Sequence, residues 1–271
     1  SREMAVRNQF FTPRYVVEFL TDNTLGRLWY EMTQGNTALN DFCHYLVCRP
    51  TEIFLAEGEQ VPKQDKTVEG LSQEELLKQP VYIPHHKLKD PRDIKMLDPA
   101  CGSMHFGLYA FDLFERIYDD AWDIEAQLGA DGFVRTEGVK PLRESYSDKD
   151  AFLRDVPRLI IERNIHGIDI DPRAVQIAGL SLWLRAQRSW QTRNVKALER
   201  PQIQRSNIVC AEPMPGEADM LNEFTDQLQP RVLGQLVTMV FERMALAGEA
   251  GSLLKIEEEI KGAVAEAVQQ W

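Results

Sequence analysis

Two segments of this 271-residue chain place carboxylates where they could contact a ligand. In the first, the apolar residues 94–97 lead into Asp98, and a run of small residues around Gly102 follows. In the second, about seventy residues later, another short apolar stretch ends at Asp169. A carboxylate at the end of a strand can accept hydrogen bonds from an ammonium group or from paired hydroxyls. Gly102 lacks a Cβ, so the backbone N–H groups of its turn can approach a ligand closely.

The elements that must position these carboxylates alternate between strand and helix. Apolar periodicity predicts three short strands, at 94–97, at 165–169 and at 208–210. It predicts helices between and before them, at 105–122, 150–163 and 174–188. Such alternation is typical of a parallel sheet covered by helices. Ligands bind at the carboxyl edge of such a sheet, which is where Asp98 and Asp169 stand.

The flanking regions are predicted to be mainly helical. A helix is expected over 14–32, with Thr12 as its N-cap and Pro13 at its first position, and a second over 38–46. Residues 56–80 are polar and are interpreted as a surface insertion, with one short helix that starts at Ser72. From 219 onward, helices broken near 230 and 248–251 are expected. The predicted regions are an N-terminal helical region (1–93), an α/β core (94–216) and a helical extension (217–271).

Composition indicates an ordinary globular protein, with 44% hydrophobic and 27% charged residues. No apolar run reaches the length that spans a bilayer, so we expect no membrane contact. The four cysteines match neither a disulfide framework nor a zinc pattern, which predicts free thiols in a reducing cytoplasm and no metal site. Cys43, His44 and Cys48 could form half of a metal site, but no further ligands accompany them.

The net charge of −11 is unfavourable for direct contact with nucleic-acid phosphates. Its distribution is uneven. Residues 217–271 hold ten acidic and four basic side chains, a net −6, which leaves −5 for residues 1–216. We therefore expect this chain alone to bind DNA weakly.

Four short motifs carry a resemblance to a known family. The string Asp-Pro-Ala-Cys-Gly-Ser at 98–103 resembles motif I of S-adenosylmethionine-dependent DNA methyltransferases of the adenine-N6 type. Gly-Ile-Asp-Ile-Asp-Pro at 167–172 resembles the next motif, and Phe-Phe-Thr-Pro at 10–13 resembles the N-terminal motif of the gamma order. Residues 207–212 fall where that family has an acid near the cofactor's adenine. The resemblance implies a Rossmann-like sheet with helices on both faces.

The same resemblance implies a cofactor, S-adenosyl-L-methionine, and a set of residues that bind it. In this sequence the set is Thr12, Pro13, Asp98, Ala100, Gly102, Ser103, Asp169, Ile170 and Glu212. By the family's pattern, Thr12 and Pro13 line the methionine end and Asp98 accepts from its ammonium group. Asp169 takes the ribose hydroxyls, Ile170 contacts the adenine ring, and Glu212 meets the adenine amino group.

Two departures from the family's pattern bear on this site. Met104 stands where many relatives have glycine, so its side chain is expected to crowd the methionine end of the pocket. The interval between Asp98 and Asp169 also exceeds the roughly twenty residues of a simple dinucleotide-binding unit, which requires helical insertions.

The wider phrase at 8–17, Asn-Gln-Phe-Phe-Thr-Pro-Arg-Tyr-Val-Val, is similar to the large BREX/PglX-type and type IIG restriction–modification methyltransferases. Those polypeptides are far longer, so the chain is expected to be a fragment. The implied partners are double-stranded DNA, contacted by parts outside this chain, and other subunits of a defence system.

The family's catalytic segment is missing from this sequence. Adenine-N6 transfer needs a flipped base whose amine is aimed by an Asn-Pro-Pro-Tyr type segment, and no Pro-Pro pair occurs here. We therefore assign no catalytic residue and expect the chain alone to be inactive. Two alternatives are a non-catalytic interaction module of a defence complex and a nicotinamide-dependent oxidoreductase. The oxidoreductase would need a Gly-x-Gly-x-x-Gly turn, whereas only Gly102 and Gly107 follow Asp98.

Overall fold

The computed structural model describes residues 12–62, 72, 77–211, 218–229, 231–244, 261, 262 and 264. The chain divides into two compact units, residues 1–211 and 212–271. The predicted boundaries after 93 and 216 remain predictions. The short helix expected at Ser72 and the last predicted helices fall largely outside the described residues.

The first unit contains a three-stranded parallel sheet. Its strands are β3 (Met96–Asp98), β4 (Ile165–Asp169) and β5 (Asn207–Cys210), in the order β3-β4-β5. In the register, Asp98 lies opposite Gly167 and Asp169 lies opposite Cys210. All three strands therefore point the same way and end at one edge. The predicted mixed α/β fold with parallel strands is confirmed.

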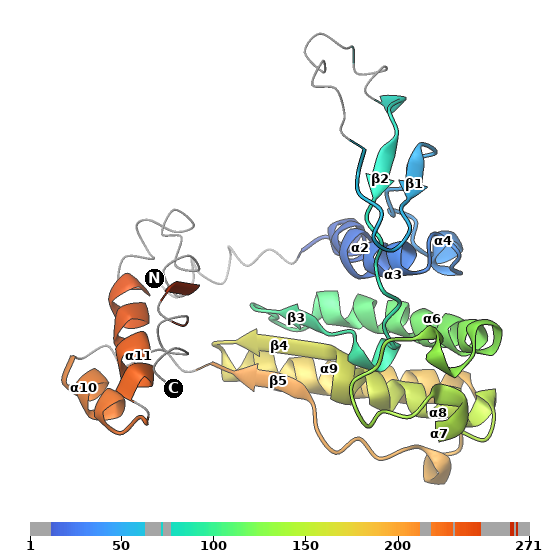
Figure 1. Ribbon diagram of the computed structural model, residues 1–271. Coiled ribbons are helices and arrows are strands. Elements are labelled where there is room, and N and C mark those ends of the chain that lie inside the picture. Colours follow the sequence, from blue (N-terminus) through green and yellow to red (C-terminus); the bar gives the residue numbers. More distant parts are fainter. Residues whose placement is uncertain are drawn as a thin grey trace. The chain divides into compact units, whose positions relative to one another are not determined.

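Long helices connect these strands. α6 (His105–Leu128) and α8 (Lys149–Leu159) lie between β3 and β4 in the chain, and α9 (Pro172–Thr192) connects β4 to β5. α6 and α9 pack against each other and on β4, and both run behind the strands in Figure 1. α6 and α9 extend beyond the predicted limits, whereas α8 ends at Leu159, before the predicted end at 163, and a π-helical turn follows it. The apolar stripe sets the buried face of a helix but not its ends.

The side chains of the strands show which face these helices cover. Ile165, Gly167 and Ile208 are buried, whereas Leu97 and Val209 on the other face are 58% and 53% exposed. Alternate residues of a strand point to opposite faces, so one face packs on α6 and α9. The prediction of helices on both faces is met on one face only within the described residues. The two connections run in the same direction across the sheet, and such connections place their helices on the same side.

Aromatic side chains of α6 form the centre of the core. Phe111, Phe114 and Tyr118 are fully buried, and Trp122 stacks on Phe152 of α8 at a centroid distance of 5.1 Å. Helix α6 therefore supplies more buried residues than α8 or α9, and α8 packs against it.

A buried cluster of charges lies beside this core. Asp90 is fully buried and accepts two hydrogen bonds of 2.8 Å from the Arg92 guanidinium. Arg135 donates to Asp90 at 2.9 Å and also pairs with Glu125 of α6. Burial opposes the charged form of Asp90, but the bonds from Arg92 hold its pKa below the ordinary value. The cluster ties the segment that leads into β3 to the C-terminal end of α6.

The N-terminal helical region packs on α6. The predicted helix over 14–32 is one helical run in three parts: α2 (Arg14–Thr21), a π-helical turn η1 (Asp22–Gly26) and α3 (Arg27–Met32). The N-cap is Pro13, without a side-chain hydrogen bond, so the prediction of Thr12 as N-cap is wrong. The second helix, α4 (Leu39–Phe42), is shorter than the predicted 38–46.

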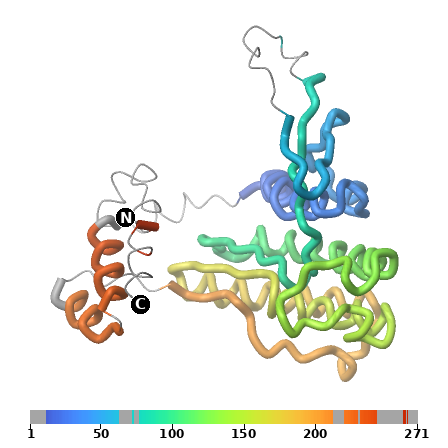
Figure 2. Tube along the Cα trace, viewed as in Figure 1, coloured from blue at the N-terminus to red at the C-terminus, as the bar shows by residue number. Residues whose placement is uncertain are grey.

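Two further strands were not predicted. β1 (Glu52–Phe54) and β2 (Val81–Ile83) pair in parallel, with Ile53 opposite Tyr82. Figures 1 and 2 show them beyond α3 and α4, away from the three-stranded sheet. Three-residue strands with mostly half-buried side chains give too little alternation to be recognised in the sequence.

The remaining elements are short or belong to the second unit. The first unit also contains η2 (Pro91–Asp93), η3 (Ala130–Gly132), α7 (Leu142–Ser145), η4 (Ile160–Asn164) and η5 (Ala197–Glu199). In the second unit, α10 (Ala218–Asp226) packs against α11 (Arg231–Met244). The predicted helical character of this region is met in its described part.

Candidate functional site at the carboxyl edge of the sheet

Asp98 and Asp169 end neighbouring strands on the same face. Asp98 lies opposite Gly167, so Asp169 is one strand over and two residues further along. With strand spacing of about 4.8 Å and a rise of about 3.3 Å per residue, their Cα atoms are about 8 Å apart. Residues 167 and 169 alternate to the same face, which places Asp98 and Asp169 together. The structure thus brings together the two carboxylates that the sequence singles out.

The turn around Gly102 is fixed by hydrogen bonds to the tip of β4. Cys101 N–H donates to the Ile168 carbonyl oxygen at 2.9 Å, and Gly102 N–H donates to Asp169 Oδ2 at 2.8 Å. Asp171 N–H donates to Asp169 Oδ1 at 2.8 Å. A carboxylate has about four acceptor positions, so each oxygen of Asp169 can accept one more donor. Asp169 is half-buried and can therefore still reach a ligand.

Asp98, at the start of the turn, and Gly102 within it are both accessible to a ligand. Asp98 Oδ1 accepts from the Ala100 N–H at 3.2 Å, and the second oxygen of Asp98 is not used by that contact. Gly102 has φ +50°, in the left-handed region, and a Cβ added there would meet no atom within 4 Å. Ser103 is half-buried beside it. The turn therefore has space above it for a ligand that approaches the backbone.

Met104 points away from this space. Its φ is +74°, and its fully buried side chain packs on Gly107, where an added Cβ would lie 2.5 Å from Met104 Cε. The left-handed backbone explains why glycine is favoured at this position, since left-handed φ is costly for other residues. The expectation that Met104 crowds the pocket is wrong, because the side chain turns into the core.

The charges of the two acids act on the cysteine between them. Cys101 is buried in the turn, and burial raises the pKa of its thiol, with further contributions from the charges of Asp98 and Asp169. A thiol with a raised pKa is a poor nucleophile. The local field of the site is therefore negative, which suits a ligand with a cationic group.

The other predicted site residues lie at different places around this edge. Thr12 and Pro13 are exposed, and Thr12 lines a groove of about 860 Å³ together with His105, the first residue of α6. Ile170 follows Asp169 and is 79% exposed, so its apolar side chain is available to a ligand. Glu212 lies outside the described residues. Ala211, just before it, donates its N–H to the Asp169 carbonyl oxygen at 2.8 Å.

Gly167 contributes to this site, although the sequence analysis did not single it out. A Cβ added to Gly167 would lie 3.0 Å from both Cβ and Sγ of Cys101 and 3.1 Å from Cδ1 of Ile208. The turn can rest on β4 only because residue 167 has no side chain. A glycine inside a strand is a signal for close backbone approach, so this role was detectable in principle.

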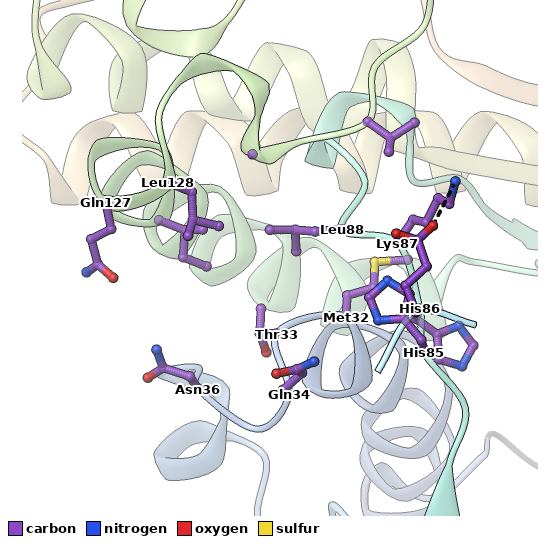
Figure 3. Close-up of a pocket in the computed structure, with 14 residues that line it drawn as sticks. Met32, Thr33, Gln34, Asn36, His85, His86, Lys87, Leu88, Gln127 and Leu128 are labelled. Atoms are coloured by element: carbon purple, nitrogen blue, oxygen red, sulfur yellow. Dashed lines mark ion pairs between the residues drawn. The ribbon is translucent and has the colours of Figure 1, made fainter. Parts of the chain in front are cut away.

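A second pocket lies at the opposite end of α6. It has a volume of about 490 Å³, and Figure 3 shows Met32 and Gln34 facing Leu88 and Leu128 across it. Lys87 and Glu57 form an ion pair of 3.3 Å at its rim. A 24-residue helix is about 36 Å long, so this pocket is remote from the turn around Gly102. None of the predicted site residues lines it.

Several predictions from composition can be compared directly with the structure. All four cysteines are free, as predicted. No group of three or more potential metal ligands occurs among the described residues. Within the same ranges, no helix combines the length and apolar character that crossing a bilayer requires.

Comparison with known proteins relates this chain to adenine-specific methyltransferases. It is 28% identical over 187 residues to the adenine-specific methyltransferase BrxX of Escherichia coli O9:H4 (strain HS). It is 26% identical over 188 residues to the adenine-specific methyltransferase PglX of Lacticaseibacillus casei (strain Zhang). Each match covers 69% of this chain but only 11% and 12% of the relatives. No family model matches the chain.

The predicted resemblance to the BREX/PglX-type methyltransferases is thereby confirmed as partial homology. The chain spans about one ninth of the length of these relatives.

Proposed function

We propose that this chain is the cofactor-binding portion of a DNA adenine-N6 methyltransferase of a restriction–modification or phage-defence system. The observation that carries the proposal is the pair Asp98 and Asp169, which end adjacent parallel strands on both sides of an open glycine turn. The partial homology to the adenine-specific methyltransferases BrxX and PglX supports the proposal that the chain is part of such an enzyme. In this proposal the three strands are part of a Rossmann-like sheet.

The residues present fit S-adenosyl-L-methionine. When bound, this cofactor supplies a methyl group on a cationic sulfur. The negative field of Asp98 and Asp169 suits that charge, and the unused acceptor positions of Asp169 suit two ribose hydroxyls. Exposed Ile170 offers an apolar contact to the adenine ring. Thr12, which lines the groove beside His105, and the adjacent Pro13 are proposed to border the methionine end. Ala100 and Ser103 complete the turn, and Glu212 is proposed to accept from the adenine amino group.

The first test is cofactor binding by an Asp169→Ala variant, measured by calorimetry. Hydrogen bonds to a carboxylate are worth about 1–3 kcal/mol, so we expect affinity to fall about tenfold or more. Asp171→Ala is the matched control, because Asp171 is two residues away and caps α9 through the Arg173 N–H at 2.9 Å. An unchanged affinity for Asp169→Ala with a loss for Asp171→Ala would move the ribose site to Asp171. Absence of binding by the unmodified chain would favour a non-catalytic interaction module.

The second test concerns transfer to DNA. The printed sequence contains no Pro-Pro pair, and its net charge is −11. We propose that base binding and amine positioning are supplied by other parts of the full-length protein, with double-stranded DNA as the partner. Positioning can be worth several kcal/mol, and phosphate contacts need cationic side chains. Incubation of the chain with tritiated cofactor and mixed-sequence DNA should leave the DNA unlabelled, whereas the full-length protein should label adenine. Labelling by the 271-residue chain would refute this assignment.

A further inference from the structure

A buried carboxylate lies between the N-terminal helices and α6, outside the residues assigned above. Asp22 is fully buried and begins the π-helical turn η1. Its Oδ1 accepts a 2.8 Å hydrogen bond from the Tyr109 hydroxyl of α6, and its Oδ2 accepts one of 3.1 Å from the Tyr45 N–H. A buried carboxylate is costly unless its oxygens are satisfied. Asp22 therefore has a strong preference for the arrangement that keeps both donors in place.

The surroundings keep Tyr109 in its role as donor. Burial and then the hydrogen bond to Asp22 raise the pKa of Tyr109 far above its ordinary value, so the hydroxyl stays protonated. The Tyr109 ring stacks on Phe42 of α4, with ring centroids 6.2 Å apart and an angle of 16° between the ring planes, which restricts the orientation of the ring. Asn23, which follows Asp22 in the chain, donates a side-chain hydrogen bond of 2.7 Å to the Tyr45 carbonyl oxygen. These contacts join three segments of the N-terminal region to one tyrosine of α6.

The position of this bond relates it to the cofactor site. Tyr109 is one helical turn after His105, and the turn around Gly102 leads directly into His105. Asp22 belongs to the same helical run that Thr12 and Pro13 precede. Thr12, Val17, His105 and Tyr109 line the same groove. The Tyr109–Asp22 bond thus connects the two elements that carry the two ends of the proposed site.

We propose that Tyr109, through its hydrogen bond to Asp22, is a positioning residue that sets Thr12 and Pro13 against the glycine turn. This inference rests on the proposed function, because it concerns the methionine end of the same site. Neither residue contacts the cofactor in this proposal. Their effect on affinity passes through the placement of Thr12.

The chain offers a matched control for this role on the same helix. Tyr118 of α6 is fully buried, whereas Tyr109 is half-buried, and the Tyr118 hydroxyl donates to Asn164 Oδ1 at 2.9 Å. Tyr118 is thirteen residues after His105, about 20 Å along the helix. Tyr118→Phe and Tyr109→Phe therefore each delete one hydrogen-bonded hydroxyl from the same helix, at different distances from the site.

The experiment measures the affinity of each variant for S-adenosyl-L-methionine by calorimetry and its stability by urea unfolding. We expect Tyr109→Phe to weaken binding about three- to tenfold, the effect of one lost hydrogen bond. Tyr118→Phe should lower the urea midpoint and leave affinity within about twofold. In a Thr12→Ala background, Tyr109→Phe should have no further effect on affinity, because coupled residues are not additive.

The outcomes separate this inference from the proposed function. If the unmodified chain binds the cofactor and Asp169→Ala weakens binding, the proposed function stands. Unchanged affinity in Tyr109→Phe would then overturn the positioning role alone. Equal losses with and without Thr12 would also overturn it, because the effect would not pass through Thr12. If the unmodified chain does not bind the cofactor, both proposals fail.

Discussion

Met104 provides a sharp test of how the glycine turn is built, because its backbone and side chain have opposite effects on stability. The backbone at φ +74° costs about 1–2 kcal/mol for a residue with a Cβ. The side chain is fully buried against Gly107, and truncation of a buried methionine to alanine costs about 2–5 kcal/mol. Glycine at position 104 would remove the backbone cost but also the packing.

These magnitudes predict an order of stability for two variants. Met104→Gly should lower the free energy of unfolding by about 1–3 kcal/mol, which is the packing loss less the relief of the left-handed backbone. Met104→Ala loses the same packing and keeps most of the backbone cost, so it should be less stable than Met104→Gly by about 1 kcal/mol. In a helix, glycine normally stabilises a protein less than alanine does. The opposite order at position 104 would therefore show that the left-handed backbone decides the stability.

Urea unfolding followed by tryptophan fluorescence measures this order. Trp29, Trp122 and Trp190 are buried in the first unit, so their emission reports on the unit that contains the turn. A Met104→Ala variant that is at least as stable as Met104→Gly would contradict this order, and so would a Met104→Gly variant that is more stable than the unmodified protein. Cofactor affinity is a second readout. Tighter binding by Met104→Gly would mean that the methionine side chain does reach the pocket.

Two further predictions follow from the acidic and thiol groups. The pKa of Asp90 is held below its ordinary value of 3.8, so its stabilisation is complete above that value and is lost as the pH falls through the lower, folded-state pKa. Asp90→Asn should cost about 3–5 kcal/mol near neutral pH and flatten the acid dependence of the urea midpoint, and an unaltered acid dependence would contradict this. Burial raises the pKa of Cys101, so iodoacetamide should modify it about tenfold or more slowly than exposed Cys48, as mass spectrometry can measure. Labelling of Cys101 as fast as that of Cys48 would show that the turn around Gly102 opens in solution.

The alternation of strands and helices around the site was predictable because each element has its own apolar signal. The strands that end at Asp98 and Asp169 are short apolar runs, and the helices behind them carry continuous buried stripes. The convergence of the two acids followed from the rule that parallel strands end at one edge.

The features that were missed depend on contacts between distant residues. The direction of Met104 is set by the space at Gly107, and the closeness of the turn to β4 is set by Gly167. The π-helical turn at Asp22 is invisible to a pattern with a period of 3.6, since it shifts the helix by a single residue. The pairing of β1 with β2 joins segments about thirty residues apart, and neither has a strong pattern of its own.

The hydrogen bond from the Gly102 N–H to Asp169 has a consequence for the thermodynamics of binding. A flexible loop loses conformational entropy when it closes on a ligand, and that loss reduces the affinity. Here the turn is already held by Asp169 and by the Ile168 carbonyl oxygen. A ligand that binds above it therefore meets a preorganised surface, and most of the ordering cost is met during folding. Through this bond, one side chain both offers acceptors to a ligand and lowers the entropy loss of binding it.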